Sequence, residues 1–304
     1  MAISAQDVKE LRELSGAGIM DCKKALQETD GDLDEALSYL QKKGEAAAEK
    51  KASRTAAEGL VETWVGDDDA SAVMVEVNCE TDFVAQNDQF KAFVDNIGET
   101  IQASGASSID ELEEVTVVGG DKTVADYTTA QITEIGENIN VRRFIRYKVD
   151  DGLVGAYVHA GGQIGVLVEV SLEGDADSDE LKTFARDVAM HVAAMNPSYL
   201  RKEDISEEDE EAQREILRAQ AEEMDKPESV IDKIVTGRLG KWRSENVLVE
   251  QPFVKDSDVS VGELADDIDG ATLESFVRYE VGEGIEEEDG KSLSEEVAEQ
   301  LRGS

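Results

Sequence analysis

The first forty residues place apolar side chains three or four positions apart, the spacing of helices that bury one face. Residues 5–43 therefore predict three short helices. Their apolar stripes are Val8, Leu11 and Leu14, then Ile19, Met20, Cys22, Ala25 and Leu26, then Leu33, Ala36, Leu37 and Leu40. Glycine-containing turns separate the helices, and Asp32 is placed to cap the third. Residues 42–54 are rich in alanine and locally basic, which predicts a helical or semi-rigid linker.

From Glu58 the pattern changes to short strands, and an internal repeat appears. The tripeptide at 59–61 recurs at 152–154, and the strand-like run at 72–77 recurs at the same spacing at 165–170. Each copy reads as a hairpin followed by a helix, and each half closes with a similar strand, at 144–152 and 276–284. We expect two repeated α+β core subdomains, each with a three-stranded antiparallel sheet covered by helices on one face.

The second half carries extra residues at 204–245, which are mostly charged or helix-forming and are interrupted by Pro227. Narrow apolar seams flank the interruption: Ile216, Leu217 and Met224 before it, and Val230, Ile231, Ile234, Val235 and Leu239 after it. So narrow a seam favours an inserted helical hairpin of the coiled-coil type over an ordinary pair of core helices. The tail from Glu286 places Leu293, Val297 and Leu301 at helical spacing, which predicts a weakly amphipathic C-terminal helix.

These patterns predict five parts. They are a helical bundle with its basic linker (1–55), a first core subdomain (56–150), a second core subdomain (151–203 and 246–285), the inserted helical hairpin (204–245) and a C-terminal helical module (286–304).

Composition bears on the size of the core and on the cellular compartment. The chain has 304 residues, 40% of them hydrophobic, so it is long enough for a sizeable core. No uninterrupted apolar run approaches the length of a membrane span, and no signal peptide is apparent at the start. The two cysteines, Cys22 and Cys79, form no CxxC pair, which favours reduced structural thiols in a cytoplasmic protein.

The charge is extreme, with 70 Asp and Glu against 30 Lys and Arg and a formal net charge of −40. A surface this acidic argues against nucleic acid as a direct ligand, because phosphate binding needs a basic face. Periodic apolar residues persist almost throughout, which argues against disorder. A folded protein with such a halophilic acidic surface suits a cytoplasm of high salt, where charges are screened over short distances.

Catalytic chemistry is hard to find. Neither histidine, His159 nor His191, has a cysteine, serine or carboxylate at motif spacing, and no nucleotide-binding, nucleophile-elbow or zinc-protease motif occurs. His191 shares a helical stripe with Phe184 and Val188, so we interpret it as a core histidine. The sequence predicts no enzyme, no metal site and no cofactor.

The link at 78–88, between a predicted strand and a predicted helix, is unusual. Such links are normally polar, yet this one holds Phe83 and Val84 beside Asp82. Two interpretations compete: the apolar side chains fold back onto the core, or they form an apolar tip built to enter a partner. The equivalent link of the second copy, residues 171–179, is mostly polar. The feature belongs to one half only, which favours the exposed tip.

Five segments, in order along the chain, closely resemble bacterial translation elongation factor Ts. They are residues 15–26, residues 76–85, residues 135–139, residues 190–194 with Pro197, and residues 251–254. The resemblance extends from about residue 5 to residue 285. It implies an N-terminal bundle like the ubiquitin-associated fold, a two-part core, an inserted coiled-coil hairpin and a C-terminal helical module.

The resemblance also implies a function, the exchange of GDP for GTP on translation elongation factor Tu during protein biosynthesis. The bundle would grip the partner's nucleotide-binding domain through Met20 and Lys23. Thr81, Asp82, Phe83 and Val84 would insert near the partner's magnesium site and dislodge the ion. His159 is our assignment for a contact of the second core half with another partner domain. The hairpin would serve association with the partner or between two copies. The alternative is an adaptor that binds a partner through the bundle without accelerating release.

Overall fold

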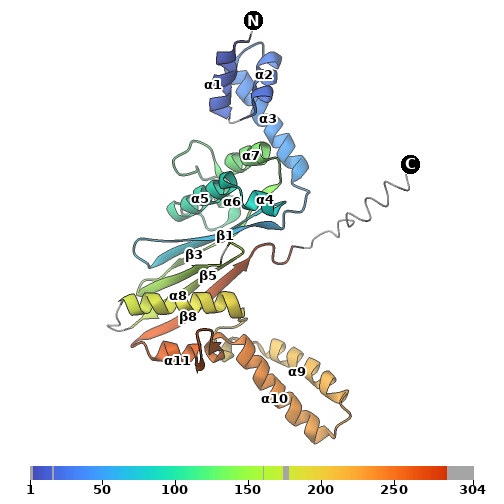
Figure 1. Cartoon of the computed structure of the whole chain (residues 1–304), viewed down its shortest axis with the longest axis vertical. Helices are drawn as coiled ribbons and strands as arrows, with labels where there is room; N and C mark the ends of the chain where they lie inside the picture. The colour runs from blue at the N-terminus through green and yellow to red at the C-terminus, as the bar shows by residue number, and fades with distance from the viewer. Residues whose placement is uncertain (1–2, 16, 160, 174–177, 286–304) are drawn as a thin grey trace, which may run out of the picture. The chain divides into compact units, whose positions relative to one another are not determined.

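A computed structural model describes residues 3–15, 17–159, 161–173 and 178–285 of the chain. The fold mixes helices with small β-sheets, in agreement with the predicted class (Figure 1). By internal contacts the described residues form two compact units, one of residues 3–62, 75–144 and 280–285 and one of residues 63–74 and 145–279. The predicted helix with Leu293, Val297 and Leu301 lies outside the described residues.

Three helices open the first unit: α1 (Ala5–Ser15), α2 (Ile19–Glu28) and α3 (Leu33–Lys51). They share a buried cluster of Leu11, Cys22, Ala25, Leu26, Ala36 and Leu40. Asp32 caps α3, since its Oδ1 accepts the Glu35 N–H at 2.9 Å. The predicted linker is therefore largely the second half of α3. Gly44 in that half lies against the Thr133 side chain, and an added Cβ there would come 3.3 Å from its Oγ1.

The first sheet has the order β1-β2-β3, with β1 at Glu58–Val65, β2 at Ser71–Cys79 and β3 at Ile139–Lys148. Between β2 and β3 the chain forms the helices α4 (Asp82–Ala85), α5 (Asp88–Ala103), α6 (Ile109–Glu113) and α7 (Val124–Ile135). Helix α5 is the helix expected after the first hairpin, and it buries apolar side chains at helical spacing: Phe90, Phe93, Val94, Ile97 and Ile101. Helices α6 and α7 have no counterpart in the sequence interpretation.

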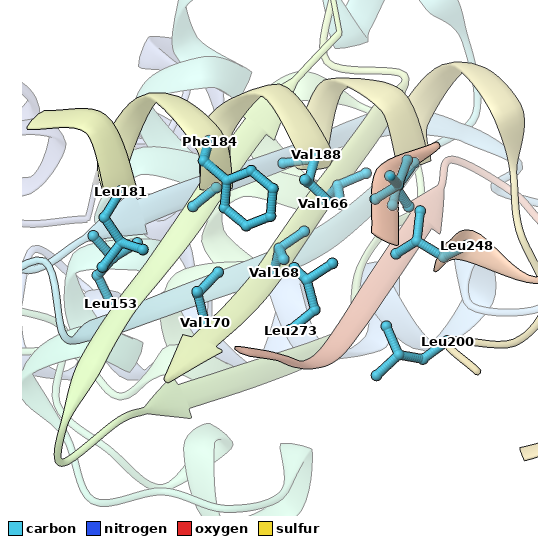
Figure 2. Close-up of a cluster of buried hydrophobic side chains, with 14 of the residues drawn as sticks. Leu153, Val166, Val168, Val170, Leu181, Phe184, Val188, Leu200, Leu248 and Leu273 are labelled. Carbon is cyan, nitrogen blue, oxygen red and sulfur yellow. The ribbon is translucent and has the colours of Figure 1, made fainter. Parts of the chain in front are cut away.

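The second sheet has the order β4-β5-β8, with β4 at Gly152–Val158, β5 at Ile164–Leu172 and β8 at Ala271–Glu280. Helix α8 (Ser178–Met195) lies across it, and Leu181, Phe184 and Val188 point toward the strands (Figure 2). The second unit also contains the short helices η1 (Lys202–Asp204), η2 (Leu248–Glu250) and α11 (Val261–Asp266), with a small sheet of β6 (Pro252–Phe253) and β7 (Asp256–Ser260).

Two glycines explain why the repeat was visible in the sequence. Gly59 is the second residue of β1 and Gly152 is the first residue of β4, with φ of 148° and 146°. A Cβ on Gly59 would lie 2.1 Å from the Val77 carbonyl oxygen, and one on Gly152 would lie 2.1 Å from the Val170 carbonyl oxygen. The same backbone approach therefore recurs in both halves, and only glycine allows it.

The extra residues of the second half form α9 (Glu207–Glu222) and α10 (Glu228–Asn246), which pack side by side. They share a narrow cluster of their own, formed by Leu217, Ala221, Ile231, Val235 and Leu239. Three side chains of the predicted seams do not join it, because Ile216, Met224 and Val230 are exposed. Arg218 binds Glu228 and Asp232 across the two helices.

The charge makes a first prediction about the fold. With a formal charge of −40, the folded chain repels itself in dilute buffer, and salt relieves this because the Debye length falls from about 10 Å at 0.1 M to about 3 Å at 1 M. We expect the melting temperature, followed by circular dichroism, to rise steadily from dilute buffer to molar KCl. A melting temperature that does not move with salt would reject the halophilic interpretation.

Candidate functional site

The turn that follows β2 presents Phe83 to solvent. The β2 strand ends at Cys79, Thr81 caps α4, and the four-residue helix carries Asp82 and Phe83 in its first turn. The Phe83 side chain is 82% exposed, the highest value among the large apolar residues that the structure describes as exposed. Ala85, two positions on, is buried and attaches the helix to the core. The interpretation in which Phe83 folds back onto the core is therefore wrong.

Thr81 holds this turn in place from both sides. Its Oγ1 accepts the Val84 N–H at 3.3 Å, which satisfies a free donor of the short helix. The same hydroxyl donates to Oε1 of Glu137 at 2.8 Å. Oε2 of Glu137 accepts the backbone N–H groups of Glu80 and Thr81, both at 3.1 Å. One carboxylate thus receives three hydrogen bonds from the start of the turn.

A second carboxylate, that of Glu80 in the turn after β2, accepts a hydrogen bond from the turn after α7. Oε1 of Glu80 accepts the Asn138 N–H at 2.6 Å and pairs with Nη1 of Arg54 at 3.3 Å. Asn138 in turn donates from Nδ2 to the Arg54 carbonyl at 2.8 Å. The turn after β2, the turn after α7 and the segment after α3 are therefore joined by polar contacts.

Cys79 has no role as a nucleophile in this site. Its side chain is fully buried, and its Sγ donates to the Thr81 carbonyl at 3.2 Å. Burial raises the pKa of the thiol to about 12, and the charge of Glu137 acts in the same direction. The thiol therefore stays protonated at neutral pH and helps to fix the backbone of the turn.

The bundle presents a second exposed face. Met20 is 74% exposed and Lys23 is also exposed, and they lie three positions apart on α2, so their side chains share one face of the helix. Leu14 and Ile19 are exposed as well, whereas Cys22 points into the bundle core. The exposed side of α2 thus combines apolar side chains with a cation.

His159 follows β4 at the hairpin tip. Its backbone N–H donates to the Ile164 carbonyl at 2.8 Å, its carbonyl accepts from Gly162 at 2.9 Å, and its exposed ring has Nδ1 3.4 Å from Oη of Tyr157. It belongs to the second compact unit, whereas Met20, Lys23 and the turn at 81–84 belong to the first.

The other histidine is a core residue, as predicted. His191 is fully buried and stacks on Phe253. Its Nδ1 accepts the Val254 N–H at 3.1 Å, so the ring proton is on Nε2, which contacts Oε1 of Gln251 at 2.9 Å. Burial lowers the pKa of this ring, which keeps it neutral.

Among the described residues, no group of three or more His, Cys, Asp or Glu side chains is placed to hold a metal ion. No helix of the described ranges is both long enough and apolar enough to cross a membrane.

Sequence reasoning did not find Glu137. It follows Gly136, whose left-handed backbone (φ 94°) ends α7 and turns the chain back toward β2. The available signal was the segment 135–139, which carried the resemblance but was given no role.

Comparisons with known proteins agree with one another. A family model described as "Elongation factor TS" matches residues 80–283. Elongation factor Ts of Halothermothrix orenii is 47% identical over 300 residues, covering 98% of this chain and 99% of the relative. Elongation factor Ts of Clostridium perfringens is 46% identical over 301 residues, covering 97% of this chain and 98% of the relative. That of Clostridium botulinum is 45% identical over 304 residues, covering 98% and 99%.

Proposed function

The chain belongs to the elongation factor Ts family, and we propose that it is a guanine-nucleotide exchange factor for elongation factor Tu. In this proposal it binds the GDP-bound form in the cytoplasm, promotes release of GDP and allows GTP to load during protein biosynthesis. The observation that carries the proposal is the exposure of Phe83, 82%, on a turn that polar contacts hold in place.

The turn at 81–84 acts as a wedge in this proposal. Phe83 supplies a large apolar surface that gains free energy only when a partner covers it. Asp82, beside it and exposed, supplies a carboxylate that disturbs the partner's magnesium and phosphate site. No covalent bond is made or broken, so the activity needs no catalytic side chain.

In this proposal the bundle and the second unit bind the partner and hold it next to the turn at 81–84. Met20 places an apolar side chain, and Lys23 a cation, on the exposed face of α2, which suits docking to a folded domain with a carboxylate at the contact. We assign them to the partner's nucleotide-binding domain. His159, exposed at the hairpin tip, is assigned to another domain of the partner.

The proposal is tested by release of labelled GDP from elongation factor Tu. A small molar fraction of the chain, relative to the GDP complex, should release all of the label at a rate proportional to chain concentration, at low and at high salt. An adaptor that docks through the bundle alone would bind the partner and leave the release rate unchanged. Binding without acceleration would therefore replace the exchange proposal with the adaptor.

The hairpin of α9 and α10 makes a further prediction, because its two ends lie close together. Arg243 binds Glu210, and the Ser198 and Tyr199 N–H groups both donate to the Asn246 carbonyl. Deleting residues 207–241 and bridging them with a short glycine linker should leave the rest folded, because α9 and α10 bury a separate cluster.

The deletion has a functional readout as well. It keeps the Glu245 carbonyl that accepts from Nε2 of Gln251. We propose that the hairpin serves association with the partner or between copies, so GDP release should slow without stopping. Circular dichroism melting is the control, and loss of a cooperative transition would mean that the hairpin belongs to the core.

A further inference from the structure

We propose that Glu137 is a positioning residue for the exchange wedge, a role that rests on the proposed function. It touches neither nucleotide nor partner in this account. Its carboxylate instead fixes the backbone from which Phe83 projects.

The geometry of Glu137 suits this role. The C-terminal turn of α7 and the left-handed Gly136 bring the side chain to the point where β2 ends. Its oxygens accept from the Glu80 N–H and the Thr81 N–H at 3.1 Å and from Thr81 Oγ1 at 2.8 Å. Hydrogen bonds to a carboxylate are charge-assisted, the stronger class of such bonds.

The effect passes to Phe83 through the Thr81 hydroxyl. A hydroxyl has one proton, and in Thr81 it is given to Glu137, so the oxygen's lone pairs are left to accept from the Val84 N–H. That bond closes the first turn of α4, on which Phe83 stands. The helix has only four residues and buries only Ala85, so tertiary packing contributes little to its order. Without Glu137, we expect Phe83 to sample positions against the protein's own surface.

Glu137→Gln is the direct test, since it keeps the size of the side chain but replaces one acceptor oxygen with an NH2 group that can only donate. The matched control is Glu134→Gln, an exposed position on α7 with the same change of charge. In the free chain, hydrogen exchange at the amides of Glu80, Thr81 and Val84 should become faster in Glu137→Gln and stay unchanged in the control. Equal protection in the two variants would overturn the proposal whether or not the chain exchanges nucleotide.

Release of labelled GDP provides the second readout. The bundle contact is untouched, so the chain concentration at half-maximal rate should stay near that of the unmodified chain, while the maximal release rate falls about tenfold, as expected when a group is misplaced by a fraction of an ångström to an ångström. In a Phe83→Ala background the same substitution should add little, because its effect passes through Phe83.

The outcomes separate the two proposals. If the unmodified chain does not accelerate release, the proposed function fails, and the hydrogen-exchange result still decides whether Glu137 orders the turn. If the unmodified chain accelerates release and Glu137→Gln does so equally well, the positioning role is wrong. A loss that is just as large with and without Phe83 would make Glu137 a contributor to the fold alone.

Discussion

Replacing Phe83 by alanine is expected to slow GDP release about thirty-fold, equivalent to about 2 kcal/mol, as at a binding hot spot. The free energy of unfolding should change by less than about 0.5 kcal/mol, as for ordinary surface substitutions. The reason is the 82% exposure of Phe83, since alanine leaves no cavity where there was no packing.

The matched control lies seven positions further on. Phe90 in α5 is fully buried, so Phe90→Ala should cost about 3–5 kcal/mol of stability, the usual range for emptying a buried phenylalanine site. Urea unfolding measures both variants, and labelled GDP release measures the function of Phe83→Ala. A stable Phe83→Ala chain that exchanges nucleotide at the normal rate would remove the wedge from the account.

Chelating magnesium allows a second test with the Phe83→Ala variant. If Phe83 acts on the partner's magnesium site, chelating magnesium should shrink the difference between the unmodified chain and Phe83→Ala. Asp82→Ala should slow release less than Phe83→Ala, because the apolar insertion remains. A thirty-fold difference that persists after chelation would place the action of Phe83 elsewhere on the partner.

Replacing Glu76 by glutamine is expected to lower the free energy of unfolding by about 3 kcal/mol, at the lower end of the range for breaking a buried ion pair. Glu76 lies on β2 with a fully buried side chain. Its Oε1 accepts from Arg142 Nη1 and the Gly282 N–H, both at 2.9 Å, and its Oε2 accepts from Arg143 Nε at 2.6 Å. A glutamine amide would turn donors toward a guanidinium. Glu99→Gln, exposed on α5, is the control for charge.

The pH dependence follows from the same contacts. Burial alone would raise the pKa of Glu76, but the bonds from Gly282, Arg142, Asn78 and Arg143 outweigh it, so the pKa lies below the ordinary value of 4.5. The unfolded chain then binds more protons than the folded chain at acid pH. The stability from Glu76 is present above pH 4.5 and is lost as pH falls through the lower, folded pKa.

His191 acts in a separate window, which allows the two groups to be told apart. Burial holds its pKa below 6.5, so folding favours the neutral ring and stability is lost as pH falls from 6.5 toward the folded pKa. Melting temperatures across acid pH should therefore show Glu76→Gln flattening the curve below pH 4.5 only. An unchanged acid limb in Glu76→Gln would mean that the carboxylate is not held ionised by its partners.

Much of the fold could be predicted because it repeats. Gly59 and Gly152 mark the same backbone approach, and the stripes of α5 and α8 have the helical period. Helices α6 and α7 were not predicted, since the sequence interpretation assigned no element to the residues between α5 and the motif at 135–139. On the hairpin, apolar spacing predicts more buried residues than the structure has. Ile216 is an example, since it is apolar yet 52% exposed.

The position of the site in the chain could be predicted, but the contacts that hold it could not. The sequence identified the turn at 81–84, because apolar residues are unusual in such a link, yet spacing alone could not decide whether Phe83 packs or protrudes. Glu137 is far from Thr81 in sequence, and a side-chain-to-backbone bond between distant turns leaves no periodic signal. Glu76 was hidden for a related reason, since a strand buried on both faces lacks the alternation that would expose a misplaced charge.

An exchange factor of this kind and GDP must oppose each other on elongation factor Tu, and a pair of titrations measures that opposition. The affinity of the chain for elongation factor Tu is measured by titration calorimetry, first with the partner free of nucleotide and then with it saturated with GDP. Linkage requires that GDP weaken the chain's binding by the factor by which the chain weakens GDP binding. We therefore expect much weaker binding to the GDP-saturated partner. Equal affinities in the two titrations would contradict the exchange proposal.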